Sequence, residues 1–153
     1  MTYTILAIGK LSQTTPEAVL IGDYVRRLRG RLDIREFAEK RGLPPGRQKE
    51  SESALLSAAI PDDAKVIVLD ERGTALSSRE LAAKIRAWRD QGAARVCFCI
   101  GGADGHADAL KKRADLILSF GRLTMPHMLA RVVLAEQIYR LQTILDNHPY
   151  HRD

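Results

Sequence analysis

The feature that most constrains the fold of this chain is an apolar run that ends in glycines, Arg95-Val-Cys-Phe-Cys-Ile-Gly-Gly-Ala-Asp-Gly105. Its valine, phenylalanine and isoleucine, with no alternating charged residues, favour a β-strand that is covered on both faces. Gly101, Gly102 and Gly105 then allow a tight turn where another molecule can approach the backbone. Because ligands of open α/β sheets bind beyond the carboxyl ends of the strands, this turn predicts a ligand-binding edge.

The spacing of these glycines is weak evidence when taken alone. It does not match Gly-x-Gly-x-x-Gly, the dinucleotide fingerprint, and the acidic ribose ligand of that motif is missing too. A nucleotide-dependent oxidoreductase is therefore disfavoured, and a plain structural turn explains the glycines equally well. A ligand-binding site is the better interpretation only if other segments of the chain reach the same edge of the sheet.

Strand and helix patterns alternate along the whole chain. Apolar runs predict strands at residues 3–8, 32–37, 65–69, 96–100 and 115–119, the third of which stops at Asp70-Glu-Arg-Gly73. Helical spacing and capping residues predict helices at residues 15–28, 51–59, 77–92, 107–113 and 128–146. This order indicates an α/β protein with a parallel sheet. A chain of 153 residues with 45% hydrophobic residues suits a single domain, residues 1–153.

The charge balance and the cysteines narrow the class of protein. A formal net charge of +5 and a pI near 9.5 favour an anionic partner, although a modest positive excess is common in proteins that bind no nucleic acid. Cys97 and Cys99 lie two apart in one strand, so we expect reduced core residues that share a face. No run is long and apolar enough for a signal sequence or a membrane span, which predicts a soluble, cytoplasmic protein with no membrane partner.

A cationic segment, Lys40-Arg-Gly-Leu-Pro-Pro-Gly-Arg-Gln-Lys49, joins the second strand to the second helix. Its prolines and glycines predict a loop that does not pack. Contact with an RNA backbone and a merely solvated loop are equally good interpretations of its charge.

A second loop reaches the predicted ligand edge. The 115–119 strand leads into Phe120-Gly-Arg-Leu-Thr-Met-Pro-His127, so we expect this strand and the 96–100 strand to be adjacent and to deliver their loops to the same edge. Backbone-rich loops with leucine, methionine and phenylalanine suit a cofactor that contains an adenine. His127 is either a surface residue or a ligand contact between the two loops. The sequence has no nucleophile elbow, P-loop lysine or cysteine beside a base, so covalent and phosphoryl chemistry are disfavoured.

The last predicted helix has apolar residues on two opposite flanks. Leu129, Val132, Val133 and Ile144 form one flank, and Leu134, Ile138, Leu141 and Leu145 form the other. One sheet cannot cover both flanks, which predicts contact with a second subunit. Glu136 and Arg140 are four residues apart within an apolar setting, so we expect a partly buried ion pair that orients neighbouring groups.

The chain ends in His148-Pro-Tyr-His-Arg-Asp153. Pro149 should stop the helix, so that Tyr150, His151 and Arg152 extend away as a tail. An aromatic ring, an imidazole and a guanidinium are groups that stack on a base and grip a phosphate, whereas terminal residues are more often simply frayed. A metal at the two histidines is a minor alternative, because no cysteine or carboxylate stands at ligand spacing.

Four ordered motifs together resemble one enzyme family. The motifs that carry the resemblance are the glycine loop at residues 100–105, the 120–127 loop, the helix segment Arg131-Val-Val-Leu-Ala-Glu-Gln-Ile-Tyr-Arg140 and the ending Asn147-His-Pro-Tyr-His-Arg152. Through them the chain resembles the RlmH (YbeA) family, whose members are rRNA pseudouridine N3-methyltransferases of the large ribosomal subunit within the SPOUT superfamily. The likeness extends from end to end of the chain. It implies methylation of N3 of a 23S rRNA pseudouridine with S-adenosyl-L-methionine, by a homodimer with a C-terminal trefoil knot.

The resemblance also implies which residues bind cofactor and substrate. The expected cofactor contacts, which include the three glycines of the glycine loop, are Leu69, Gly101, Gly102, Gly105, Phe120, Gly121, Arg122, Leu123, Thr124 and Met125. The expected substrate contacts are His127, Arg131, Tyr150, His151 and Arg152, with His151 and Arg152 as catalytic hypotheses and no metal. The tail is expected to act in the second subunit's site, on the folded ribosome. The alternative is a non-enzymatic RNA- or ribosome-binding factor, for which the two loops and the tail would lack a shared purpose.

Overall fold

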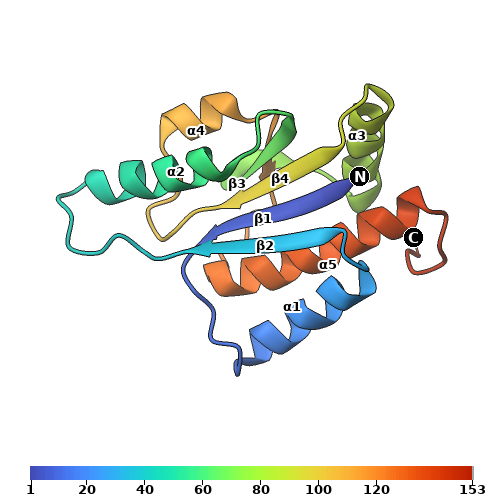
Figure 1. Cartoon of the computed structure of the whole chain (residues 1–153), viewed down its shortest axis with the longest axis horizontal. Helices are drawn as coiled ribbons and strands as arrows, with labels where there is room; N and C mark the ends of the chain where they lie inside the picture. Colours follow the sequence, from blue (N-terminus) through green and yellow to red (C-terminus); the bar gives the residue numbers. More distant parts are fainter. Residues whose placement is uncertain (153) are drawn as a thin grey trace.

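Five parallel strands form a single sheet in the computed structural model, which describes residues 1–152. The strand order is β2-β1-β4-β3-β5, and β1 and β2 run toward the left in Figure 1. Their bounds are Thr2–Ile8 for β1, Leu32–Phe37 for β2, Ala64–Ala75 for β3, Arg95–Ile100 for β4 and Leu116–Ser119 for β5. The predicted parallel α/β architecture is confirmed.

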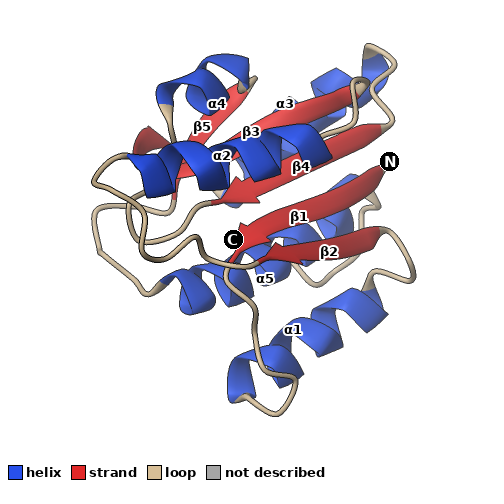
Figure 2. Ribbon diagram, turned by 60° about the vertical axis from the view of Figure 1, so that its left-hand side comes forward, coloured by secondary structure: helices blue, strands red, loops and turns tan. Residues whose placement is uncertain are grey.

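Helices cover both faces of this sheet (Figures 1 and 2). They are α1 at Pro16–Arg27, α2 at Arg47–Ala59, α3 at Ser78–Asp90, α4 at Asp108–Arg113 and α5 at His127–Leu145. The core residues show that α1, α3 and α5 pack on one face and that α2 and α4 pack on the other. Among the described residues, no helix combines the length and the apolar character that a membrane crossing requires.

The two faces follow from the alternation of side chains along each strand. On β1, Tyr3 and Ile5 face the larger core while Leu6 and Ile8 face the smaller one. Cys97 and Cys99 both lie in the smaller core as buried free thiols, as predicted. Burial raises the pKa of Cys99 to about 12, so this sulfur stays a thiol at neutral pH.

Strand β3 is longer than the sequence predicted. Its pairing with β5 shifts register between Leu69 and Thr74, and both of these residues face Leu118. The intervening Asp70-Glu-Arg-Gly73 segment is therefore an excursion inside the strand and not its end. A Cβ atom on Gly73 would lie 2.7 Å from the carbonyl carbon and oxygen of Ile117, so only glycine allows this approach.

Helix α2 begins earlier than predicted, at Arg47 instead of Ser51. Gly46 holds the left-handed conformation at the N-cap, with φ of 81°, and so turns the proline-rich segment directly into the helix. The end of the cationic segment is thus helical. Its remaining part, residues 40–46, is exposed as expected.

Helix α5 lies between α1 and α3 beneath the sheet, so the chain itself covers more of the helix than the sequence predicted. Leu134, Ile138 and Leu141 are fully buried in the sheet core, and Val132 packs in a cluster with Ile21 of α1. On the other predicted flank only Leu129 is exposed, with 46% of its surface accessible to solvent. The apolar surface left for a second subunit is therefore small along α5 itself.

Candidate functional site

The carboxyl ends of β3, β4 and β5 surround a cavity of about 500 Å³. Three segments far apart in the sequence form its walls, namely the β3 excursion, the glycine loop after β4 and the loop after β5. The predicted cofactor residues that line it are Leu69, Gly101, Gly102, Gly105, Phe120, Gly121, Leu123, Thr124 and Met125. The predicted ligand edge thus coincides with this cavity, although the cofactor contacts themselves stay predictions.

The glycine loop is closed by its own backbone. Gly102 and Gly105 form an isolated antiparallel bridge, in which the amide of Gly105 donates to the carbonyl of Gly102 at 3.1 Å. Gly105 holds a positive φ of 74°, which favours glycine. At Gly101 the reason differs, because a Cβ atom there would lie 2.9 Å from the carbonyl oxygen of Gly105. The absence of a side chain at Gly101 therefore serves loop closure, and its predicted contact with a cofactor stays a prediction.

Helix α2 anchors this loop from behind. The hydroxyl of Ser53 accepts a hydrogen bond from the amide of Ala107 at 2.8 Å, in a buried setting. Glu52, only 1% exposed, accepts from the amide of Lys40 at 3.0 Å and lies against Gly102. The cationic segment and the glycine loop are therefore joined through two polar residues of one helix, neither of which the sequence pattern singled out.

The loop after β5 is shaped by Ser119 and Gly121. The Ser119 hydroxyl donates to the carbonyl of Glu71 and accepts from the amide of Gly121, both at 3.1 Å, which ties the loop to the β3 excursion. Gly121 needs its glycine for a φ of 111°. Leu123 is 86% exposed at the mouth of the cavity, and Arg122 does not line the cavity.

Charged and titratable side chains that sequence reasoning missed also border the cavity. Lys111 of α4 forms an ion pair with Asp70 at 2.6 Å. Burial raises the pKa of the Asp70 carboxyl, but the hydrogen bond and charge of Lys111 and the amide of Arg72 outweigh it, so the pKa stays below its ordinary value. Beside this pair lies His106, which is only 3% exposed. Its position directly after the glycine loop was the one available sequence signal.

The two predicted substrate residues at the start of α5 have different surroundings. His127 lines the cavity, and its Nε2 atom is buried without a hydrogen-bond partner. Arg131 is 1% exposed and lies outside the cavity, where its guanidinium binds Glu36 and donates to the carbonyls of Ile8 and Gly9. In this conformation Arg131 holds α5 to the ends of β1 and β2 and is not available to an RNA.

The tail folds back onto α5 instead of extending away. Tyr150 packs edge-on against Tyr139 with ring centroids 4.7 Å apart, and its hydroxyl donates to Glu136 at 3.1 Å. Arg140 binds Glu136 at 2.6 Å and stands over the Tyr150 ring. The predicted half-buried Glu136–Arg140 pair is thus confirmed, and it orients the tail. Burial, with the neighbouring Tyr24 and Glu136, raises the pKa of Tyr150 to about 12.

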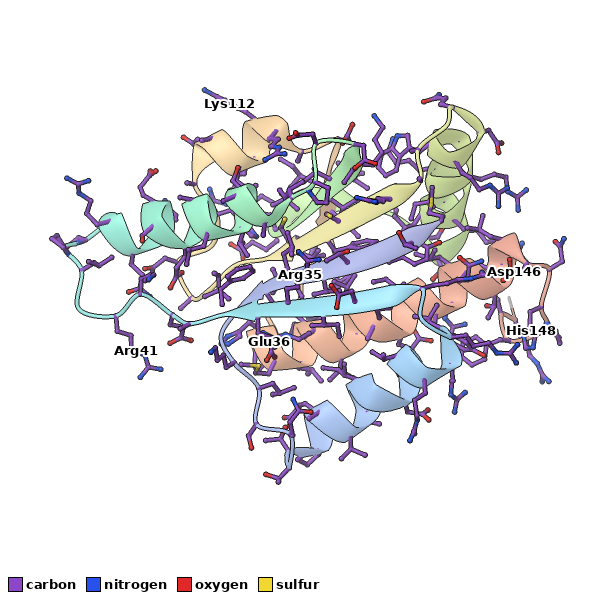
Figure 3. The ribbon with its side chains drawn as sticks, in the orientation of Figure 1. Arg35, Glu36, Arg41, Lys112, Asp146 and His148 are labelled. Atoms are coloured by element: carbon purple, nitrogen blue, oxygen red, sulfur yellow. The ribbon has the colours of Figure 1, made fainter. Side chains whose placement is uncertain are left out.

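The tail and the cavity lie at opposite ends of helix α5. His127 begins α5 at the cavity, whereas His151 contacts Arg140 near the other end of this 19-residue helix, which is about 28 Å long. Figure 3 shows the same separation, because Glu36 of β2, which binds Arg131, lies far from His148 of the tail. Residues 150–152 therefore cannot reach the cavity of their own chain in this conformation.

The arrangement is chemically suited to hold a nucleoside-like ligand beside an anionic polymer. Leu69, Ile100 and Phe120 supply apolar surface that suits a flat ring. The cations Lys49 and Arg72 also line the cavity, together with the acidic residues Asp70, Glu71 and Asp104. Within residues 1–152, no group of three or more histidine, cysteine, aspartate or glutamate side chains is placed to bind a metal ion.

Comparison with known proteins identifies relatives over the full length. The family described as "Predicted SPOUT methyltransferase" matches residues 1–151. Ribosomal RNA large subunit methyltransferase H of Paramagnetospirillum magneticum is 49% identical over 152 residues, with 99% of both chains covered. The protein of the same name from Paracoccus denitrificans is 51% identical over 163 residues, with both chains fully covered.

A solved structure shares the fold. The structure of a probable methylase family protein from Haemophilus influenzae Rd KW20 superposes with a TM-score of 0.53 at 15% identity. The match covers 95% of this chain but only 66% of that one. At this identity the likeness concerns the fold alone.

Proposed function

The chain belongs to the SPOUT methyltransferase family, and we propose that it transfers a methyl group from S-adenosyl-L-methionine to N3 of a pseudouridine in 23S rRNA. The name shared by its relatives supports the rRNA of the large ribosomal subunit as substrate. The structural observation that carries the proposal is the cavity at the ends of β3, β4 and β5, which is walled by backbone-rich loops and apolar side chains. We propose that the whole chain acts as one methyltransferase domain.

The residues around the cavity fit this cofactor in size and in chemistry. Cofactor pockets commonly enclose roughly 300–1,000 Å³, which spans the volume found here. Leu69, Ile100 and Phe120 offer apolar surface to a flat base, and the two glycine-containing loops leave backbone uncovered by side chains. On this basis we retain the predicted cofactor residues, except that Arg122 would need to move to take part.

The bound cofactor supplies a methyl group that its sulfonium has already activated. The task of the protein is then to hold the pseudouridine in line with that methyl group and to help N3 lose its proton. We assign stacking on the nucleoside to Tyr150, proton acceptance to His151 and stabilisation of the developing negative charge to Arg152. His127, which borders the cavity, would contact the same nucleoside.

The separation of the tail from its own cavity supports a homodimer in which each tail completes the other subunit's site. Exposed Leu123 and Leu129, both near the cavity, are suitable apolar contacts for such an interface. We also propose the trefoil knot of the family. Its support is the path of residues 120–126, which lead from the edge strand β5 to a helix held between α1 and α3 on one face of the sheet.

We propose the large subunit within the ribosome as the substrate, which would place the protein in the cytoplasm. The net charge of +5 and the cations near the cavity favour an RNA backbone, but so compact a chain has little surface with which to recognise an isolated hairpin. A binding factor without enzymatic activity would use the same cations. It would have no use for a cavity between three loops, so the enzyme is the better supported function.

The proposal is tested with ribosomes and large subunits from a strain that lacks the homologous activity. Incubation with methyl-labelled S-adenosylmethionine should label 23S rRNA, and mass spectrometry of the digested rRNA should find one N3-methylated pseudouridine. Free 23S rRNA serves as the comparison and should be labelled far less. If the protein binds ribosomes but leaves them unlabelled while S-adenosylmethionine gives no calorimetric signal, the binding-factor alternative is correct.

A further inference from the structure

A second cleft, of about 550 Å³, lies at the end of α5 that is distant from the cofactor cavity. Its walls come from the end of α1, the turn into β2 and the residues that follow α5. Figure 3 labels two of its lining residues, Asp146 and His148, at this end of the molecule. None of its residues lines the cofactor cavity. We call it the arginine cleft, because its lining includes Arg27, Arg29 and Arg31.

The cleft carries an excess of positive charge. The segment Arg26-Arg-Leu-Arg-Gly-Arg31 has four arginines in six residues. Asp23 binds the first two at 3.0 and 2.8 Å, and Asp146 binds the last at 3.2 Å. Four arginines against these two carboxylates leave a net charge of +2. Among residues 1–152 no carboxylate binds Arg29, so its charge is available to an anion from solution.

Arg29 occupies a backbone position that favours a different residue. Its φ is 51°, the left-handed conformation in which glycine commonly follows a helix. Cations in the last turn of a helix stabilise it through the helix dipole, which accounts for Arg26 and Arg27. Arg29 lies beyond the helix, and within the described chain its side chain makes no hydrogen bond. What arginine offers here over glycine is an exposed guanidinium that a ligand can reach.

Aromatic rings join the arginine cleft to the tail. The guanidinium of Arg27 stands over the rings of Tyr24 and Tyr139, at 5.9 and 5.7 Å from their centroids. Tyr139 packs in turn against Tyr150 of the tail, with ring centroids 4.7 Å apart. Cations beside a row of aromatic rings are typical of surfaces that bind single-stranded RNA, because bases stack on rings while phosphates bind cations. The cleft and the tail therefore form one surface of this kind.

We propose that the arginine cleft binds the phosphate backbone of the rRNA strand that flanks the target nucleoside. The inference rests on the proposed function, in which the neighbouring tail contacts that nucleoside. A guanidinium donates two parallel hydrogen bonds to one phosphate, and the donors of Arg29 are free within the described chain. Phosphate contacts carry no sequence information, so the cleft supplies affinity and register. An acidic protein would use the arginines but not the row of aromatic rings.

The test measures binding and methylation of ribosomes from a strain that lacks the homologous activity. Arg29→Glu should raise both the Kd for ribosomes and the KM by about tenfold, the usual effect of losing a charged hydrogen bond, and leave kcat within about twofold. Arg29→Gln should have a smaller effect and make the slope of log affinity against log salt concentration shallower by about 0.7 for the lost phosphate contact. Arg29→Lys keeps the charge and should lie near the parent. Lys112→Gln, which removes an exposed cation far from His148 in Figure 3, is the control and should change neither constant.

Stability separates phosphate binding from a structural role. Arg29→Gly relieves the left-handed backbone, so it should raise the melting temperature by about 2–4 °C while it weakens ribosome binding as much as Arg29→Gln does. All Arg29 variants should bind S-adenosylhomocysteine, the demethylated cofactor, as the parent does, and light scattering should find an unchanged oligomeric state.

Three outcomes would overturn the inference. Parent-like Kd and KM in Arg29→Glu would mean that the arginines form a solvated face only. Loss of the parent's oligomeric state in Arg29→Glu would assign the cleft to contact between copies of the chain. A lowered kcat with unchanged ribosome affinity would mean that Arg29 acts on the tail. If the parent binds ribosomes without methylating them, the proposed function fails, and the comparison of affinities decides the cleft by itself.

Discussion

A Cβ atom on Gly101 would lie 2.9 Å from the carbonyl oxygen of Gly105, closer than real Cβ contacts allow. The two ends of the glycine loop therefore touch, and the first glycine is needed for the loop to close on itself. Any side chain at Gly101 must push the loop away from the cavity wall that it forms.

Gly101→Ala should consequently open the loop and weaken S-adenosylhomocysteine by at least tenfold, with a loss of about 1–3 kcal/mol of stability from overpacking. Calorimetry and urea unfolding measure the two effects. The matched control is Gly22→Ala in α1, where a Cβ atom meets nothing within 4 Å. That control should stabilise the protein by about 0.5–1 kcal/mol and leave affinity unchanged. Parent-like affinity of Gly101→Ala would contradict this account of the loop.

Arg131→Met should unfold the protein more readily instead of merely weakening RNA binding. The change removes the cation that binds Glu36 and the carbonyls of Ile8 and Gly9, a loss of about 3–5 kcal/mol for a broken buried pair. Among the described residues, the amide of Leu11 would remain as the one hydrogen-bond donor to the Glu36 carboxylate. Arg122→Met, at an exposed position, should change stability by less than about 0.5 kcal/mol. A stable Arg131→Met protein with selectively lost ribosome binding would restore the substrate role that the sequence predicted.

The stability of the protein should fall between about pH 6.5 and pH 4 because of His106. In the unfolded chain this histidine takes up a proton near its ordinary pKa of about 6.5, whereas in the fold its pKa is lowered to about 4. The unfolded state binds more protons in this window, so acid favours unfolding, by about 2–3 kcal/mol at pH 4.5. Urea unfolding of the parent and of His106→Leu at pH 7.5, 5.5 and 4.5 should show the steeper decline in the parent. Parallel declines would exclude a buried neutral His106.

The fold was largely predictable because its strands are continuous apolar runs and its helix starts carry local signals. The capping box of Ser77 and Glu80, for example, is present as the sequence predicted. The error at β3 has a different origin. Asp70-Glu-Arg-Gly73 is a typical turn sequence, and only the close approach of Gly73 to Ile117, a contact between distant residues, carries the strand onward.

The candidate site was predictable where glycines define its loops. It was less predictable where the role of a side chain depends on contacts with residues far away in the sequence. Parallel strands all end at one edge of a sheet, so the cavity walls followed from the parallel arrangement. The strand order did not follow from the sequence, because β3 lies between β4 and β5, which we expected to be adjacent. Arg131 was assigned to the substrate because arginine suits RNA, but its three acceptors lie at and just beyond the ends of β1 and β2. His106 had no motif, and the burial of its ring beneath the glycine loop is visible only in three dimensions.

Leu129→Glu should separate the proposed dimer into monomers, because it introduces a charge at an exposed apolar position near the cavity. Leu20→Glu in α1, where the side chain is 50% exposed, is the matched control and should remain a dimer. Light scattering at micromolar concentration distinguishes the two. Ile138 is unsuitable for this test, since it is fully buried and a charge there would disrupt the core. A monomeric parent, or a dimeric Leu129→Glu, would be inconsistent with an interface at the start of α5.

Deletion of residues 150–153 should leave a folded chain that binds S-adenosylhomocysteine but methylates ribosomes slower by orders of magnitude. The deletion removes the contact of Tyr150 with Tyr139 and its hydrogen bond to Glu136, so some stability is lost. An aromatic pair of this kind contributes about 0.5–1.5 kcal/mol. The truncated protein should therefore melt a few degrees below the parent. Tyr150→Leu separates the two roles, because it keeps His151 and Arg152 while it removes the stacking ring.

The same deletion tests which cavity the tail serves. A truncated subunit keeps an intact cavity, and a Gly101→Ala subunit keeps an intact tail, so neither homodimer should methylate ribosomes efficiently. If each tail acts in the other subunit, a mixed dimer combines the intact tail with the intact cavity at one of its two sites, and up to about half of the parent activity should return. Differently tagged subunits allow the mixed dimers to be purified before assay. Full activity of the truncated homodimer would remove the tail from the mechanism, whereas inactive mixed dimers would mean that the tail must unfold from α5 to serve its own chain.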